Sequence, residues 1–165
     1  MMRDTHKAHT MDEPTTKPSE ARAPRASHWG SEARLKALVV DGDEANRSFA
    51  AETLHSFAPG FDVATARDPE QACAWLETFR PDLVVIESGF LEDGAGSLME
   101  RLRTDPRTRG CRMVVVAAGE RAGKTPDDGR LERARLEADA VIEAPFGLPR
   151  LLDVVRRVMT HEKPH

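Results

Sequence analysis

PDLVVIE, residues 81–87, is the stretch of sequence that decides the fold. Four consecutive apolar residues, Leu83 to Ile86, follow the Pro81-Asp82 pair and end at a carboxylate, Glu87. A short continuous apolar run of this kind is typical of a strand in the interior of a parallel sheet. We therefore expect a buried strand here, with Glu87 at its carboxyl end.

From Arg34 onward, short apolar runs of this kind alternate with amphipathic stretches. We expect strands at Lys36–Val40, Phe61–Ala66, Leu83–Glu87, Arg112–Ala117 and Ala140–Ile142. We expect helices at Glu44–Phe57, Pro69–Phe79, Gly94–Thr104, Asp128–Glu137 and Gly147–Thr160, the last with its apolar face at Leu148, Leu151, Leu152, Val155 and Val158. Strict alternation of strands and helices predicts a doubly wound α/β fold with a parallel sheet, whose functional residues gather at the carboxyl ends of the strands.

The length of 165 residues suits one domain with a continuous core. Residues 1–33 combine Thr, Ser, Pro and both charge signs without an apolar period, which predicts a disordered tail. We place the domain at residues 34–160, with a short tail at 161–165 and no output domain.

Charge and composition exclude several classes of function. The formal net charge is −4 with acidic and basic residues well mixed, so we expect no nucleic-acid partner. No apolar run is long enough for a membrane span and the start of the chain lacks a signal-peptide core, so we expect no membrane association and a cytoplasmic location. The two cysteines, Cys73 and Cys111, have neither disulfide-framework nor zinc spacing.

Four motifs resemble those of bacterial response-regulator receiver domains over about Leu35 to Met159. They are Leu38-Val39-Val40-Asp41, the PDLVVIE strand, Asp93-Gly94 and Ala144-Pro145-Phe146. The resemblance implies the CheY-like, flavodoxin-like (βα)5 architecture with strand order 2-1-3-4-5, and a role in two-component signal transduction.

In that family the third strand ends in an aspartate that accepts a phosphoryl group, and two acids after the first strand help it to hold magnesium. Asp41 matches the first acid, Gly42 stands where the second is usual, and Glu87 replaces the acceptor. Asp43 has two readings: it turns toward the pocket in place of the missing acid, or it is the N-cap of the helix that begins at Glu44.

Further positions lack the side chains that the family uses in phosphorylation. Ala117 lies where the resemblance implies a hydroxyl residue, Ala144 where it implies a lysine, and Val141 where it implies an aromatic residue. The extra methylene of Glu87 displaces the carboxylate by about 1.5 Å, which is enough to impair in-line phosphoryl transfer. We interpret Asp41, Asp43, Glu87, Ala117 and Ala144 as a degenerate phosphoacceptor pocket without catalytic residues.

Two other features concern ligands and partners. Asp41 and Glu87 could bind Mg²⁺ or Ca²⁺ weakly as a carboxylate pair, and we expect no other cofactor. Arg130 and Arg133 on the fourth helix, with Arg150 and Arg156 on the fifth, form a candidate surface for a protein partner. The face made by these two helices and the fifth strand is a candidate homodimer interface. The alternative for these arginines is a solvated face with i,i+4 ion pairs such as Arg133 with Glu137.

The sequence thus predicts a stand-alone bacterial pseudo-receiver, not an enzyme, that acts by phosphorylation-independent protein–protein interaction. One alternative is a residually active phosphoacceptor that uses Glu87 or Asp93. A second is a nucleotide-binding protein, because residues 118–125 fit a relaxed phosphate-loop pattern around Gly123-Lys124-Thr125. Pro126 argues against it, since it disfavours the helix that must begin at Thr125.

Overall fold

The computed structural model of the chain describes residues 34–57, 60–91, 95–117 and 128–161. Its elements follow in the order β1 (Leu35–Val40), α1 (Glu44–Ser56), β2 (Phe61–Ala66), α2 (Pro69–Thr78), β3 (Leu83–Glu87), η1 (Ser88–Leu91), α3 (Ala95–Thr104), β4 (Arg112–Ala117), α4 (Asp128–Glu137), β5 (Ala140–Glu143) and α5 (Leu148–Thr160). The predicted strands and helices are confirmed, with each end within one residue of its expected position. The short 3₁₀ helix η1 was not predicted.

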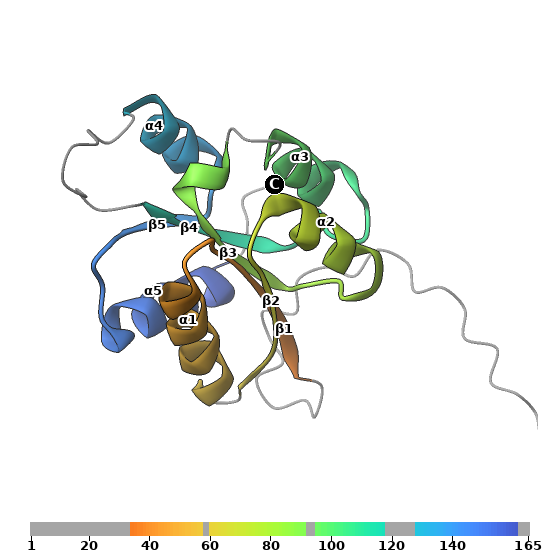
Figure 1. Cartoon of the computed structure of the whole chain (residues 1–165). Helices are drawn as coiled ribbons and strands as arrows, with labels where there is room; N and C mark the ends of the chain where they lie inside the picture. The colour runs from red at the N-terminus through yellow and green to blue at the C-terminus, as the bar shows by residue number, and fades with distance from the viewer. Residues whose placement is uncertain (1–33, 58–59, 92–94, 118–127, 162–165) are drawn as a thin grey trace, which may run out of the picture.

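The five strands form one parallel sheet in the order β2-β1-β3-β4-β5. In Figure 1, α1 and α5 cover one face of the sheet and α2, α3 and α4 cover the other. This is the doubly wound α/β architecture with strand order 2-1-3-4-5 that the sequence predicts. The strand order reverses between β1 and β3, and in such sheets ligands bind beyond the carboxyl ends of the strands at this point.

Local sequence sets the starts of two helices. The Asp43 side chain accepts a hydrogen bond from the Asn46 amide at 3.0 Å, and the Asp68 side chain accepts one from the Gln71 amide at 2.8 Å. Each aspartate satisfies an amide of the first turn that has no partner within the helix. Pro69 then follows Asp68 at the first helical position, where its missing amide costs no hydrogen bond.

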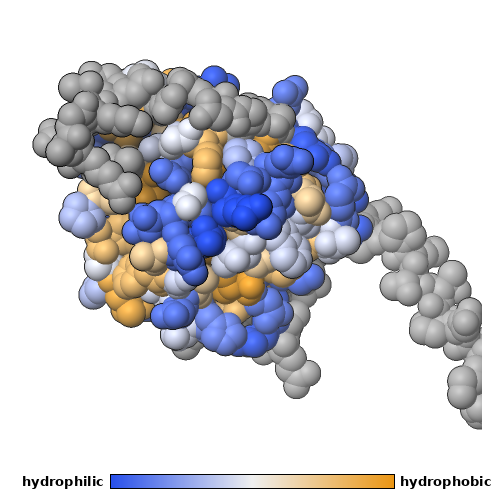
Figure 2. All heavy atoms as spheres, in the orientation of Figure 1, coloured by the Kyte–Doolittle hydropathy of each residue, from blue (hydrophilic) through white to orange (hydrophobic). Residues whose placement is uncertain are grey.

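Helix α5 buries a narrower face than the sequence predicts. Its buried residues are Leu151, Val154, Val155 and Val158, which follow the i, i+3, i+4, i+7 spacing of one helical face. Leu148, which the sequence places on the apolar face of this helix, is 46% exposed. It is the first residue of α5, one turn before the buried face begins. Figure 2 shows hydrophobic side chains at the surface around the connection from β5 to α5.

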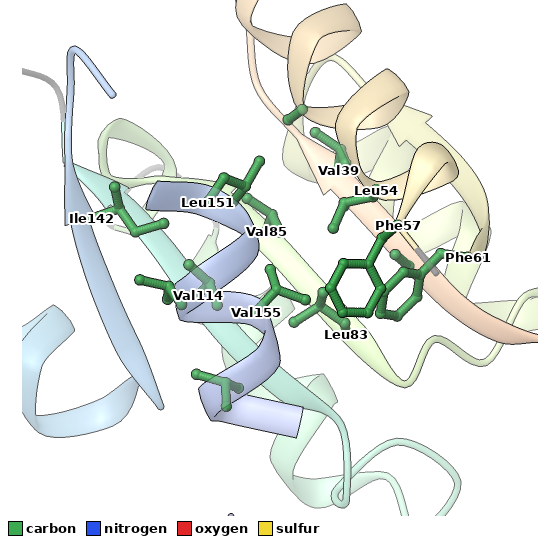
Figure 3. Close-up of a cluster of buried hydrophobic side chains, with 14 of the residues drawn as sticks. Val39, Leu54, Phe57, Phe61, Leu83, Val85, Val114, Ile142, Leu151 and Val155 are labelled. Atoms are coloured by element: carbon green, nitrogen blue, oxygen red, sulfur yellow. The ribbon is translucent and has the colours of Figure 1, made fainter. Parts of the chain in front are cut away.

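Two apolar layers, one on each face of the sheet, form the core. Residues of β1 alternate between them, because successive side chains of a strand point to opposite faces. Ala37 and Val39 pack toward α1 and α5, and Leu38 and Val40 pack toward α2 and α3. Figure 3 shows the first layer, in which Leu54 of α1, Phe57 directly after α1, and Leu151 and Val155 of α5 meet the sheet. Among the helices that the structure describes, none is long and apolar enough to cross a membrane.

Candidate functional site

The strand register brings Asp41 and Glu87 together. Val40 is paired with Ile86 in the parallel ladder between β1 and β3, so the next residue on each strand, Asp41 or Glu87, lies at the same edge of the sheet. Asp41 is only 6% exposed, whereas Glu87 is half-buried. Two carboxyl groups predicted from the sequence to share a site are therefore neighbours at the switch point of the sheet.

The backbone around Asp41 is held by three hydrogen bonds. The Asp41 amide donates to the Ala66 carbonyl oxygen at 3.1 Å, and the Arg47 Nη1 donates to the Asp41 carbonyl oxygen at 2.8 Å. The Asp43 amide donates to Asp41 Oδ1 at 2.8 Å. These contacts fix the turn between β1 and α1.

Glu87 folds back toward that same turn. Its Oε2 accepts a hydrogen bond from the Gly42 amide at 3.2 Å. A Cβ atom built on Gly42 would lie 3.4 Å from Cζ of Phe90 and 3.8 Å from Glu87 Oε2, both ordinary contact distances. A larger residue at position 42 would therefore contact Phe90 and Glu87 without having to displace them.

The environment of Asp41 raises its pKa from 3.8 to about 6. Desolvation by burial is the largest cause, because it disfavours the ionised carboxylate. The hydrogen bond from the Asp43 amide lowers the pKa, while the charges of Glu87 and Asp43 and a side-chain hydrogen bond with Glu87 raise it. A substantial fraction of Asp41 is thus protonated at mildly acidic pH.

Asp43 takes the second of its two predicted roles. Its carboxylate caps α1 by accepting the Asn46 amide hydrogen bond, and Asp43 is not among the residues that line the pocket described below. Across the described ranges, no group of three His, Cys, Asp or Glu side chains is arranged to hold a metal ion. Magnesium prefers a near-octahedral set of oxygen ligands and usually keeps several waters. The three-acid set that the fold family would use is therefore not formed here, and weak cation binding by Asp41 and Glu87 alone stays a prediction.

Beside the two carboxyl groups lies a pocket of about 210 Å³. It opens between the start of α1, the ends of β1, β3 and β4, and the connection from β5 to α5. Its walls are mostly apolar, and within the part of the chain that the structure describes the two carboxyl groups are the only ionisable side chains that line it. The lining residues are Val39, Val40, Asp41, Asn46, Phe49, Ala50, Val85, Glu87, Val116, Ala144, Pro145 and Phe146.

The alanines predicted for this site lie near the same pocket. Ala144 lines it and Ala117, which is buried, follows the lining residue Val116. The Ala144 amide donates to the Ala117 carbonyl oxygen at 2.9 Å, and the Ala144-Pro145 peptide bond is cis. The two positions are joined through the backbone and bring neither a hydroxyl nor an ammonium group to the site.

The candidate partner surface draws on two helices, α4 and α5, that cover opposite faces of the sheet. Arg133 of α4 forms an ion pair with Glu137 at 3.2 Å, which is the predicted i,i+4 pair. The guanidinium of Arg156 in α5 lies 5.8 Å from the centroid of the Phe57 ring, at the end of α1. Arg150 is exposed in the first turn of α5, and the side chain of Arg130 lies outside the described part of the chain. A shared surface of these arginines stays a prediction.

Sequence reasoning missed three contributors to the site. Arg47 holds the Asp41 carbonyl, Phe90 packs beside Gly42, and Phe49 forms a wall of the pocket. The Phe49 ring lies 6.1 Å from the Phe146 ring, centroid to centroid. The position of Phe49 two turns after the N-cap was the available signal, since it places an exposed aromatic residue near the start of α1. The predicted phosphate-loop segment at 118–125, and Asp93, lie outside the described residues.

The solved structures to which the chain is similar include response-regulator receiver domains. The chemotaxis response regulator CheY4 of Vibrio cholerae is 21% identical, with a TM-score of 0.62 over 76% of this chain and 99% of that chain. A response regulator from Thermotoga maritima is 21% identical, with a TM-score of 0.61 over 78% of this chain and 100% of that chain. A signal receiver domain from Bermanella marisrubri is 24% identical, with a TM-score of 0.61 over 76% of this chain and 98% of that chain.

No protein-family model and no curated protein sequence matches the chain. The chain has the fold of a response-regulator receiver domain. More particularly, it is similar to the CheY-like receivers, which it covers almost from end to end.

Proposed function

We propose that this protein acts in two-component-type signalling as a receiver-fold module that works through protein–protein contacts, without phosphorylation and without enzymatic activity. The fold supports the signalling role, because its structural neighbours are response regulators from bacteria such as Vibrio cholerae. The site supports the absence of phosphoryl chemistry.

The position of the Glu87 carboxylate carries this proposal. An acceptor must present a free oxygen in line with the phosphoryl donor, and small misplacements of reacting groups cost large factors in rate. Glu87 instead directs Oε2 at the Gly42 amide and interacts with Asp41 through its side chain. The nucleophile is therefore already engaged by groups of the protein.

The electrostatics of the pocket point the same way. A phosphoryl group arriving as a dianion needs cations or hydrogen-bond donors to neutralise it. Among the described residues, the pocket lining provides two carboxyl groups and no basic side chain, and Ala117 and Ala144 add no donor side chain. An incoming phosphate would thus meet like charge.

The test is incubation of the full chain with acetyl phosphate and Mg²⁺, followed by intact-mass spectrometry. We expect the protein to keep its unmodified mass under conditions in which a phosphorylatable receiver, run in parallel, gains one phosphoryl group. A gain of one phosphoryl group on the wild type overturns the proposal.

The matched control is Glu87→Gln, which keeps the side-chain length and removes the nucleophilic carboxylate. If the wild type gains a phosphoryl group and Glu87→Gln does not, Glu87 is the acceptor of an active receiver. If both gain it, the acceptor is another residue, and Asp93 becomes the first to substitute.

A further inference from the structure

The pocket beside Asp41 and Glu87 is sized for one side chain. A cavity of about 150 Å³ is known to admit a molecule such as benzene, and this pocket measures about 210 Å³. Pockets for drug-sized ligands and cofactors are about 300–1,000 Å³. The volume therefore favours an elongated group of a few heavy atoms over a nucleotide or a cofactor.

The lining determines which chemistry that group has. The walls are apolar or aromatic, formed by side chains such as Val39, Phe49 and Phe146. At one end the lining changes to Asp41 and Glu87, which are acidic. An occupant with an aliphatic stem and a cationic head matches both parts, because the stem removes apolar surface from water and the head meets the carboxyl groups.

The hydrogen bonds already made at the acidic end favour an ammonium over a guanidinium. Asp41 Oδ1 accepts the Asp43 amide and Glu87 Oε2 accepts the Gly42 amide. One oxygen of each carboxyl group thus accepts a backbone amide, and the two side chains also hydrogen-bond to each other, so a cation that replaces this contact must lie between them. Bidentate pairing with a guanidinium instead uses both oxygens of one carboxylate. An ammonium is a compact charge with three donors, and it can bond one oxygen from each of two carboxyl groups.

The surface around the pocket indicates that this cation belongs to a protein. Phe49, which lines the pocket, is 38% exposed, and Leu148, two residues beyond Phe146, is 46% exposed. Figure 2 shows hydrophobic surface around the connection from β5 to α5. A free amine would leave this apolar surface in water, whereas the chain on either side of an inserted residue would cover it.

We propose that the pocket binds the side chain of a lysine from a partner protein, with its ammonium between Asp41 and Glu87 and its aliphatic stem against Phe49 and Phe146. This inference rests on the proposed function and names the chemistry of the partner at the same site. The lysine is the central anchor of the contact, and the exposed apolar residues nearby form its surroundings.

The experiment is an amide NMR titration of the full chain with lysine that is acetylated at its α-amino group and capped as the methylamide, so that the side-chain ammonium is free. The norleucine counterpart, which has the same aliphatic stem without charge, is titrated in parallel. We expect saturable shifts at the Gly42 and Asn46 amides with the lysine probe, at a dissociation constant in the millimolar range expected for so few heavy atoms. Norleucine should bind at least about tenfold more weakly, since it lacks the charged hydrogen bonds. Equal binding of both probes, or no binding of either, overturns the proposal.

Two more probes separate the rival sources of the cation. The arginine counterpart should bind more weakly than lysine, and tighter arginine binding refutes the choice of an ammonium. Putrescine, a free diamine, should bind no more tightly than the lysine probe. A clear preference for putrescine refutes a partner protein as the source.

Two variants locate the site. Glu87→Gln should weaken lysine binding about tenfold, because one charged acceptor is lost. Ala144→Lys places a lysine in the lining and should abolish binding of the probe. If one variant alters amide shifts throughout the domain, its fold is changed and the other variant is used to test the site. Unchanged lysine binding in a folded variant refutes the proposed site. Phosphorylation of the wild type in the mass test would overturn the proposed function while leaving this titration interpretable.

Discussion

Replacement of Asp41 by Asn should stabilise the fold at neutral pH. Asp41 is 6% exposed and lies against Glu87, so its ionised form is disfavoured by desolvation and by like charge. Asparagine has the same shape and stays neutral. Its side-chain oxygen can still accept the Asp43 amide hydrogen bond, and its amide group can donate to Glu87.

The size of the effect follows from the pKa of Asp41, which is raised from 3.8 to about 6. Each tenfold change in proton affinity corresponds to about 1.4 kcal/mol, which sets an upper limit of about 3 kcal/mol. Because Asp41 lines a pocket open to water, screening reduces this to about 1–2 kcal/mol. The folded state binds the Asp41 proton more tightly than the unfolded state. The contribution of protonated Asp41 to the free energy of unfolding is therefore fully favourable below pH 3.8 and is lost as the pH rises through about 6.

The assay is urea unfolding of the wild type and Asp41→Asn at pH 7.5, 6 and 4.5. We expect the free energy of unfolding of the variant to exceed that of the wild type by about 1–2 kcal/mol at pH 7.5. This difference in free energy of unfolding should narrow steadily toward pH 4.5. Asp153→Asn is the matched control, because Asp153 is exposed and paired with Arg157 at 2.9 Å. It should lose less than about 0.5 kcal/mol at pH 7.5. A destabilised Asp41→Asn at pH 7.5, or a gap that does not change with pH, would refute the reasoning.

Three further predictions concern contacts outside the pocket. Asp43→Ala should lower the free energy of unfolding by about 1 kcal/mol in urea titrations, because it removes the N-cap of α1. Asp139→Ala should cost about 3 kcal/mol in the same assay and more than Arg112→Met, because it leaves the buried Arg112 guanidinium without its carboxylate. Asp105→Asn should lower the melting temperature at pH 7 but not near pH 2. The hydrogen bond from Arg107 lowers the pKa of Asp105 to about 2, so the stabilising effect of ionised Asp105 is present above pH 3.8 and is lost as the pH falls toward 2. An unchanged melting temperature at pH 7 would contradict that assignment.

Much of the site was predictable because its parts lie at the ends of strongly patterned strands. The apolar run before Glu87 and the run before Asp41 each end in a carboxylate. In a parallel sheet such ends lie at one edge, and the strand order that the family resemblance implies makes these two strands neighbours. The N-cap role of Asp43 was likewise predictable, although the sequence did not decide between this role and a second one in the pocket.

The pocket itself was not predictable. It depends on the distances between Phe49, Phe146 and the carboxyl groups, which belong to segments far apart in the chain. The exposure of Leu148 has the same origin: helical spacing placed it with the apolar face, but the position of α5 on the sheet determines where burial begins.

The sequence by itself determined the alternation of strands and helices, their limits and the edge of the sheet that carries the acidic residues. These properties depend on periodicity and capping within a few neighbouring residues, which each segment contains. The tertiary structure alone decided that Glu87 turns to the Gly42 amide, 45 residues away, and that an apolar pocket ends at two carboxyl groups. Such features require the register of the sheet and the packing of helices on it, because only these fix side chains from distant segments relative to one another.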